Sequence, residues 1–212
     1  MSGTPALSQI IEGALLAAGG PLTPDQLLGL FAEEERPDRD LVLEVLASLE
    51  KDYVNRGVEL AQVAGGYRVQ VRAELAPWVG RLWDEKPARY SRALLETLAL
   101  IAYRQPITRG EIEDIRGVSV STNIVKTLAE REWIRIVGHR DVPGRPALYA
   151  TTRKFLDYFG LRSLNDLPAL AEIRDPEFLG DELDLDEPER SGDRDGQPPQ
   201  VVPLPTAADN DD

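Results

Sequence analysis

Two stretches carry the same helix-starting pattern: Gly20-Pro21-Leu22-Thr23-Pro24-Asp25-Gln26-Leu27 and, 85 residues later, Gln105-Pro106-Ile107-Thr108-Arg109-Gly110-Glu111-Ile112. In each stretch a threonine is placed to accept a hydrogen bond from an unpaired backbone N–H in the first turn of a helix. The glutamine or glutamate three residues later reaches back to the N–H of that threonine, which completes a capping box. Two such starts in matching positions predict an internal repeat.

The residues around the two capping boxes repeat as well. An amphipathic helix is predicted before each box, and a helix, a strand–turn–strand pattern and a short terminal helix are predicted after it. Besides the capped helices, the predicted elements are helices over residues 7–18, 40–55 and 73–83 with strands within 58–71, and helices over 94–102, 121–131 and 152–159 with strands within 133–150. This order is that of a winged-helix unit. The predicted fold is therefore mainly α with small β wings, built as two tandem winged-helix (helix-turn-helix) domains.

The repeat divides the chain into three parts. The residue before a proline is disfavoured in a helix, so Lys86-Pro87-Ala88 marks a boundary. We expect a first unit over residues 1–85, a second unit over 86–170 and a tail over 171–212. The tail is acidic and proline-rich, and it has too little apolar surface to offset the entropy of ordering, which predicts disorder. It serves either to attract a basic partner or only to keep the protein in solution.

Charge and composition exclude several classes of protein. The net charge of −13 is uneven: residues 1–85 carry 14 acidic and 7 basic side chains, residues 86–171 carry 9 and 14, and residues 172–212 carry 14 and 3. The absence of cysteine and the single histidine, His139, predict no disulfide, no thiolate chemistry, no metal site and no cofactor. No apolar run is long enough for a membrane span and no secretory signal precedes the first helix, so we expect a cytoplasmic protein without membrane contact.

Neither catalysis nor sequence-specific DNA binding fits the motifs. Nucleotide-binding glycine patterns and a nucleophile elbow are both missing, so we expect no enzyme activity. The third helix of the first unit is rich in carboxylates, which oppose binding to phosphates. In the second unit Lys126, His139 and Arg140 are the candidate contacts to the DNA backbone, and DNA is expected to bind weakly at most. A winged-helix DNA-binding transcription regulator remains the alternative function.

Several residues of the second unit suggest protein binding, because packing alone does not require them. Bulky polar groups stand at a helix end, an arginine stands on a stiff turn, and aromatic rings gather on one short helix. These candidates are Tyr103, Arg104, Gln105, Pro106, Arg145, Phe155, Tyr158 and Phe159. The alternatives are that Tyr103 belongs to the core, that Arg145 stabilises the wing, and that the aromatic residues cover their own unit.

Specific motifs stand in the second unit over residues 91–109, 115–118, 138–152, 155–161 and 164–168, and Gly65-Gly66-Tyr67-Arg68-Val69 is the best match in the first unit. Through these motifs the sequence resembles the segregation and condensation protein B family, over about residues 8–170. Arg116 and Tyr149, which lie in these motifs, join the candidates for partner binding.

The resemblance implies an accessory subunit of a bacterial condensin-like complex. Members of the family dimerise and bind a kleisin subunit of the segregation and condensation protein A type, and through the kleisin they associate indirectly with an SMC ATPase. The implied function is chromosome condensation and segregation during cell division, at the nucleoid. The second unit is the better candidate for holding the kleisin, in a groove that takes a helix or an extended segment.

We also expect a homodimer formed mainly by the first unit. Its helices over residues 7–18 and 41–53 have more apolar positions than a core of about 80 residues uses. A contiguous apolar patch of this kind is typical of an interface, and two-fold pairing is its commonest closed form. The alternative is that the two units bury these faces on each other within one chain.

Overall fold

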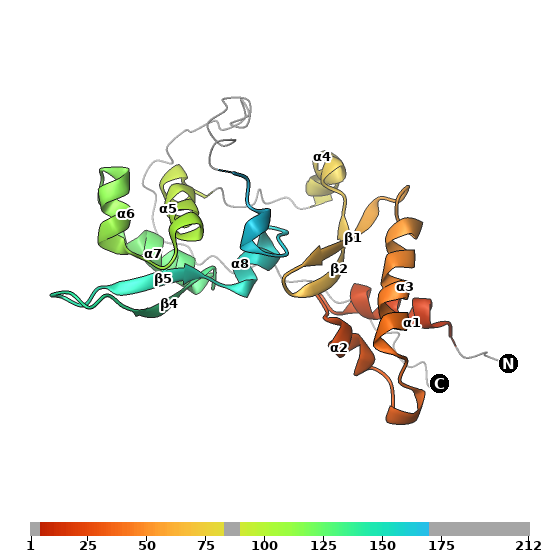
Figure 1. The fold of residues 1–212 in the computed structure, drawn as a ribbon. Helices are drawn as coiled ribbons and strands as arrows, with labels where there is room; N and C mark the ends of the chain where they lie inside the picture. Colours follow the sequence, from red (N-terminus) through yellow and green to blue (C-terminus); the bar gives the residue numbers. More distant parts are fainter. Residues whose placement is uncertain (1–4, 83–89, 170–212) are drawn as a thin grey trace, which may run out of the picture.

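The computed structural model of the chain describes residues 5–82 and 90–169. It is mainly helical with small antiparallel sheets, which confirms the fold class at this level (Figure 1). The N-terminal half (residues 5–82) contains α1 (Leu7–Ala17), α2 (Pro24–Leu28), α3 (Arg39–Asp52), β1 (Val58–Val63), β2 (Gly66–Val71) and α4 (Ala76–Val79). The C-terminal half (residues 90–169) contains α5 (Arg92–Arg104), β3 (Ile107–Thr108), α6 (Arg109–Arg116), α7 (Thr122–Glu130), β4 (Ile134–His139), β5 (Ala147–Thr151) and α8 (Arg153–Tyr158). The boundary at Lys86 and the tail lie outside the described residues.

Both predicted capping boxes are present. Thr23 Oγ1 accepts a hydrogen bond from the N–H of Gln26 at 3.2 Å, and Gln26 Oε1 accepts from the N–H of Thr23 at 2.9 Å. In the second repeat Thr108 and Glu111 form the same pair, at 3.2 and 2.8 Å. The two capped helices, α2 and α6, therefore begin in the same way.

Each half has its own hydrophobic core. In the N-terminal half α1, α2 and α3 pack together with β1, and the buried residues are Ile11, Leu15, Leu27, Val42, Leu46, Leu49, Tyr53 and Leu60. In the C-terminal half the core joins α5, α6 and α7 to the sheet and α8, through Leu94, Leu98, Ile101, Ala102, Ile107, Ile112, Val120, Leu128, Trp133, Ile134 and Phe155.

The sheets are small and antiparallel. β1 and β2 form a hairpin, while the second sheet has the order β3-β5-β4. The two-residue strand β3 was not predicted; Ile107 lies opposite Tyr149 in β5. At the hairpin turn Gly66 has a φ of +124°, and a Cβ there would lie 2.1 Å from the carbonyl oxygen of Leu22. Glycine is therefore required at position 66, where the hairpin meets the segment that leads into α2.

The helix predicted over residues 73–83 is helical in its described part, but it is not a single regular α-helix. The described part of this segment consists of two 3₁₀ turns, Ala73–Leu75 and Gly80–Leu82, on either side of the four-residue α4. Pro77 stands in the first turn of α4 and has no N–H to donate to the preceding turn, and Gly80 follows α4 and has a low helix propensity, so a regular α-helix does not run through the whole segment.

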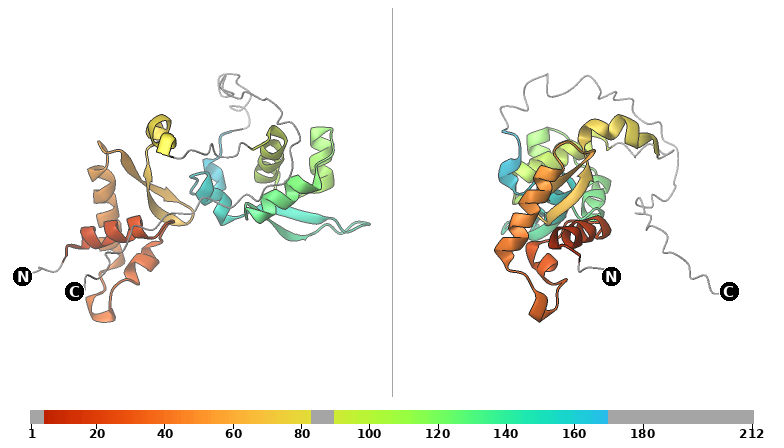
Figure 2. Two further views of the ribbon diagram at one scale, coloured as in Figure 1. Left: turned by 180° about the vertical axis from the view of Figure 1, so that it is seen from behind. Right: turned by 90° about the vertical axis from the view of Figure 1, so that its right-hand side faces the viewer.

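The two halves meet where α8 lies beside the turn between β1 and β2 (Figure 2). The carboxylate of Asp157 accepts a hydrogen bond from the N–H of Gly65, and the carbonyl oxygen of Asp157 accepts from Arg68 at 2.8 Å. Arg153 donates to the carbonyl oxygen of Ala64 at 2.9 Å. These polar bonds, which we call the hairpin–α8 contact, fasten one half to the other.

No helix in the described ranges has the length and apolar character that crossing a bilayer requires.

Candidate partner-binding surface

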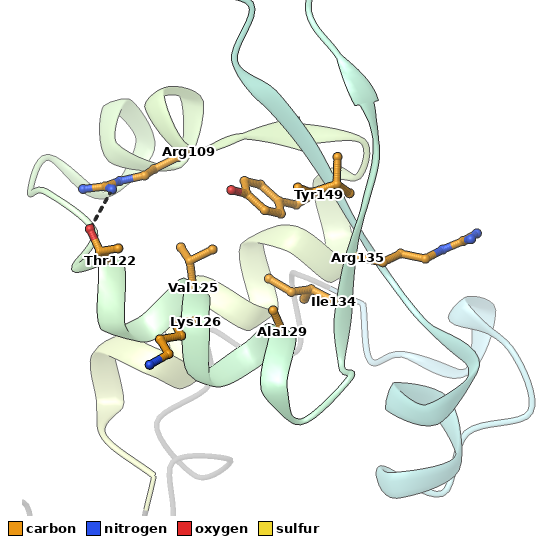
Figure 3. A pocket seen from close by; sticks show the side chains of 9 residues that line it. Arg109, Thr122, Val125, Lys126, Ala129, Ile134, Arg135 and Tyr149 are labelled. Atoms are coloured by element: carbon orange, nitrogen blue, oxygen red, sulfur yellow. Dashed lines mark hydrogen bonds between the residues drawn. The ribbon is translucent and has the colours of Figure 1, made fainter.

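A groove of about 280 Å³ opens between α7 and the sheet of the C-terminal half (Figure 3). Its lining is mostly apolar, with cationic side chains around it. The lining residues are Arg109, Thr122, Val125, Lys126, Ala129, Ile134, Arg135, Ile136 and Tyr149. Figure 3 shows the side chains of Val125 and Tyr149 directed into the groove, whereas Arg135 points away from it. The arrangement suits an apolar segment that also carries acidic groups.

Hydrogen bonds between α6 and α7 hold one wall of the groove in place. Arg109 pairs with Glu113 at 3.0 Å and donates to Thr122 Oγ1 at 3.2 Å. The carboxylate of Glu113 also accepts from the N–H of Val120 at 2.8 Å. This backbone bond, followed by the bond from Arg109, lowers the pKa of Glu113. The carboxylate is thus kept charged where the chain turns from α6 into α7.

Among the predicted partner-binding residues, Tyr149 lines the groove and the rest lie elsewhere. Gln105 precedes β3 and extends its hydrogen bonding to β5. Its Oε1 accepts from the N–H of Thr151, the last residue of β5, at 2.6 Å. The hydroxyl of Tyr103 donates to the carbonyl oxygen of Pro168 at 2.6 Å. Arg104 and Pro106 are exposed. This cluster at the end of α5 therefore mixes residues that stabilise the fold with residues that face solvent.

Arg116 is largely buried, with 11% of its side chain exposed. Its Nη2 lies 3.1 Å from Glu96, which also pairs with Arg92. The hydrogen bond from Arg92 is the main reason why the pKa of Glu96 is lowered, and the bond from Arg116 acts in the same direction. The Nε of Arg116 has no hydrogen-bond partner within the described ranges. The structure thus gives Arg116 a position that ties α6 to α5.

The aromatic residues of α8 belong to a larger ring cluster centred on Trp133. Phe155 is buried in the core, whereas Tyr158 and Phe159 are 53% and 41% exposed. The rings of Tyr158 and Phe159 lie 4.6 and 5.3 Å from Trp133. Tyr90 completes the cluster, and burial, then a hydrogen bond with Tyr158, raise its pKa to about 12. Part of the predicted aromatic surface is therefore core, and part faces solvent.

Arg131 also belongs to this cluster, since its guanidinium lies 4.6 Å from the centre of the Tyr90 ring. Sequence reasoning did not assign Tyr90, Trp133 or Arg131 to it. Tyr90 precedes α5, whereas Arg131 and Trp133 lie between α7 and β4, about 40 residues later. No local pattern therefore indicated that Tyr90 meets them.

The candidate DNA contacts are partly neutralised. Arg140 pairs with Glu111 at 2.5 Å, and Lys126 lies 3.5 Å from Glu130. Backbone donation from Thr108, followed by the bond from Arg140, lowers the pKa of Glu111 to about 2, so this carboxylate stays charged. His139 and Arg145 are exposed, and Arg145 has a φ of +38°. The wing between β4 and β5 thus carries several basic side chains, and the carboxylate of Glu111 lies beside one of them, Arg140.

The groove, the capped helices and the ring cluster lie in the segment that matches a known family. Residues 9–170 match the family model described as Segregation and condensation complex subunit ScpB. The chain belongs to this family. It is 52% identical over 199 residues to the Segregation and condensation protein B homolog of Coxiella burnetii, an alignment that covers 92% of this chain and 94% of that relative.

Two solved ScpB structures are also similar to the chain. ScpB from Mycobacterium tuberculosis is 34% identical with a TM-score of 0.34, and the match covers 76% of this chain and 99% of that one. A structure described as a dimer of the ScpB N-terminal domain complexed with ScpA peptide is 23% identical with a TM-score of 0.33, and covers 36% and 93%.

Proposed function

We propose that this chain is a non-catalytic accessory subunit of a bacterial condensin-like SMC complex, acting in chromosome condensation and segregation at the nucleoid. Membership of the ScpB family, matched over residues 9–170, is the observation that carries this proposal. Its partners are a second copy of itself and a kleisin of the segregation and condensation protein A type, and it reaches the SMC ATPase through that kleisin.

In this proposal residues 1–85 and 86–170 are two winged-helix domains with different tasks, and the first forms the homodimer. Large apolar side chains exposed in the N-terminal half are the candidates for the dimer contact. They are Leu16, Leu30, Leu41, Val54, Val71, Trp78 and Leu82. Sedimentation of the full chain should give a dimer at tens of micromolar. Serine substitutions at Leu16 and Leu82 should weaken it more than the same change at Leu164, which is exposed in the C-terminal half.

The second domain holds the kleisin. Support comes from the groove with Tyr149 in its lining, and from the exposed residues Arg104, Arg145, Tyr158 and Phe159 on the same half. Gln105, Arg116 and Phe155 make internal contacts, so their part in binding is to position the surface.

Co-purification from extract of the organism's own cells, with the chain at its natural level, tests the function. A kleisin is expected to co-purify with it. A gel shift at near-physiological salt separates the alternative, since a transcription regulator binds a defined site far more tightly than bulk DNA. Tight binding to one operator without a kleisin would overturn the proposal; the ion pairs of Lys126 and Arg140 with carboxylates favour the kleisin.

A further inference from the structure

Strand β4 is the edge of its sheet, and its outer side is open among the described residues. In the order β3-β5-β4, β5 is the neighbour of β4. The N–H of Thr152 donates to the carbonyl oxygen of Trp133 at 3.0 Å, so these two residues form a hydrogen-bonded pair. Bonded and non-bonded pairs alternate in an antiparallel ladder. The N–H and C=O of Ile136, which lies opposite Tyr149, therefore point outward from the sheet.

The same edge is apolar on one face and cationic on the other. Ile134 and Ile136 line the groove beside Val125, and Ile136 is 56% exposed. Arg135 points away from the groove (Figure 3), is exposed, and forms no ion pair with any residue in the described ranges. Proteins normally cover or charge an open edge of this kind. An added strand would need alternating apolar and acidic side chains.

The chain itself contains such a segment. Asp181-Glu182-Leu183-Asp184-Leu185-Asp186-Glu187 alternates leucine with acid at its centre and has five carboxylates in seven residues. In a strand, Leu183 and Leu185 would share one face and Asp184 the other. We propose that this segment adds to the outer edge of β4, with its leucines over the groove beside Ile136 and Asp184 on the side of Arg135.

The length of the connecting chain allows this. The hydroxyl of Tyr103 bonds Pro168, and Gln105 bonds Thr151, the residue opposite Ile134. The described chain therefore ends close to the sheet. The 11 residues between Ala169 and Asp181 span up to about 40 Å when extended.

The bound segment covers the apolar edge of β4 and occupies the groove. On the proposed function, on which this one consequence rests, a kleisin has to displace the segment before it enters the groove.

Amide hydrogen exchange measured by NMR on the full chain, without any partner, tests the proposal. The tether gives an effective concentration in the millimolar range, so a segment with a Kd of about 0.1 mM slows exchange about tenfold. We expect the Ile136 amide to exchange about tenfold more slowly in the natural chain than in the double variant Leu183→Ser, Leu185→Ser. The variant Leu204→Ser, which changes a tail leucine outside the segment, should behave like the natural chain.

Arg135 supplies one further control and one further test. Its N–H faces β5, so its exchange rate should be the same in all these chains. Arg135→Glu in the full chain should speed exchange at Ile136, because it places a carboxylate beside Asp184. Equal Ile136 rates in the natural chain and the double leucine variant would overturn the proposal. Protection that rises with protein concentration would also overturn it, because the segment would then come from a second copy. Since no kleisin is present, failure here leaves the co-purification test unaffected.

Discussion

The carboxylate of Asp157 in α8 accepts a hydrogen bond from the backbone N–H of Gly65, 92 residues earlier at the turn between β1 and β2. This bond belongs to the hairpin–α8 contact, and it explains why a glycine stands at position 65. A Cβ at position 65 would lie 2.6 Å from both Asp157 Oδ2 and the Cγ of Pro21. Pro21 is held in a rigid ring, so the movable group is the carboxylate of Asp157.

We predict that Gly65→Ala separates the two halves without unfolding either. The new methyl displaces the Asp157 carboxylate and removes a charged hydrogen bond, an interaction worth about 1.5–3 kcal/mol. Small-angle X-ray scattering should show a larger radius of gyration, with unchanged circular dichroism.

Gly13→Ala is the matched control, because no atom lies within 4 Å of a Cβ at position 13. This change within α1 should leave the scattering curve unaltered and stabilise the protein by about 0.5–1 kcal/mol. If Gly65→Ala scatters like Gly13→Ala, the hairpin–α8 contact does not set the relative position of the halves.

We predict that Glu111 makes the stability of the C-terminal half depend on pH in the acid range. Its pKa is lowered from 4.5 to about 2, mainly by the N–H of Thr108 and then by Arg140. A carboxyl whose pKa is lower in the folded state stabilises the protein above its unfolded pKa. This contribution is lost as the pH falls from about 4.5 through about 2. The urea midpoint should therefore fall more between about pH 5 and pH 2.5 in the natural chain than in Glu111→Gln.

The first repeat provides an internal comparison, since its capping box carries the neutral Gln26 at the matching position. Gln26→Glu should introduce a similar acid dependence into the N-terminal half. The same loss of midpoint in Glu111→Gln and the natural chain would show that other carboxylates cause it.

The capping boxes were predictable because each depends on residues three positions apart, and the strands of the first hairpin because their side chains alternate. The strand β3 was missed because two residues carry no periodic signal. It forms only because Ile107 meets Tyr149, which is distant in sequence. The hairpin–α8 contact was missed for the same reason.

The partner-binding surface was predicted less well than the fold. Residue type selected Gln105 and Phe155 as unusual, but it did not distinguish a side chain that completes the fold from one that faces a partner. The structure shows that Gln105 bonds Thr151 and that Phe155 is buried. The groove lining was not predicted apart from Tyr149 and Lys126, because α7 and β4 meet only after folding. The sequence predicts Lys126 as a contact to DNA, not to a protein partner.

We predict that Gln105 acts through stability. Gln105→Leu leaves the N–H of Thr151 without its acceptor and should lower the free energy of unfolding by about 1–3 kcal/mol. Gln105→Glu keeps an acceptor oxygen for Thr151 but loses the donor to the carbonyl oxygen of Ala102, 3.3 Å away, so it should recover part of the lost stability. Urea unfolding of the two variants makes the comparison. Equal stabilities would mean that the bond between Gln105 and Thr151 contributes nothing measurable.

We predict that Ala129→Glu reduces kleisin binding at least tenfold while the fold is kept. Ala129 is exposed on α7 and lines the groove, so its replacement should not disturb the core. A carboxylate there would lose its hydration when an apolar segment enters, and about 1.4 kcal/mol of this cost already lowers affinity tenfold.

Asn123→Glu is the control, because it adds the same charge to α7 outside the groove lining and should bind normally. Fluorescence anisotropy with a labelled kleisin measures both, and thermal unfolding checks the fold. Equal affinities of the two variants would move the kleisin site away from the groove, and reduced binding by Tyr158→Ala in its place would assign the site to the exposed aromatic residues of α8.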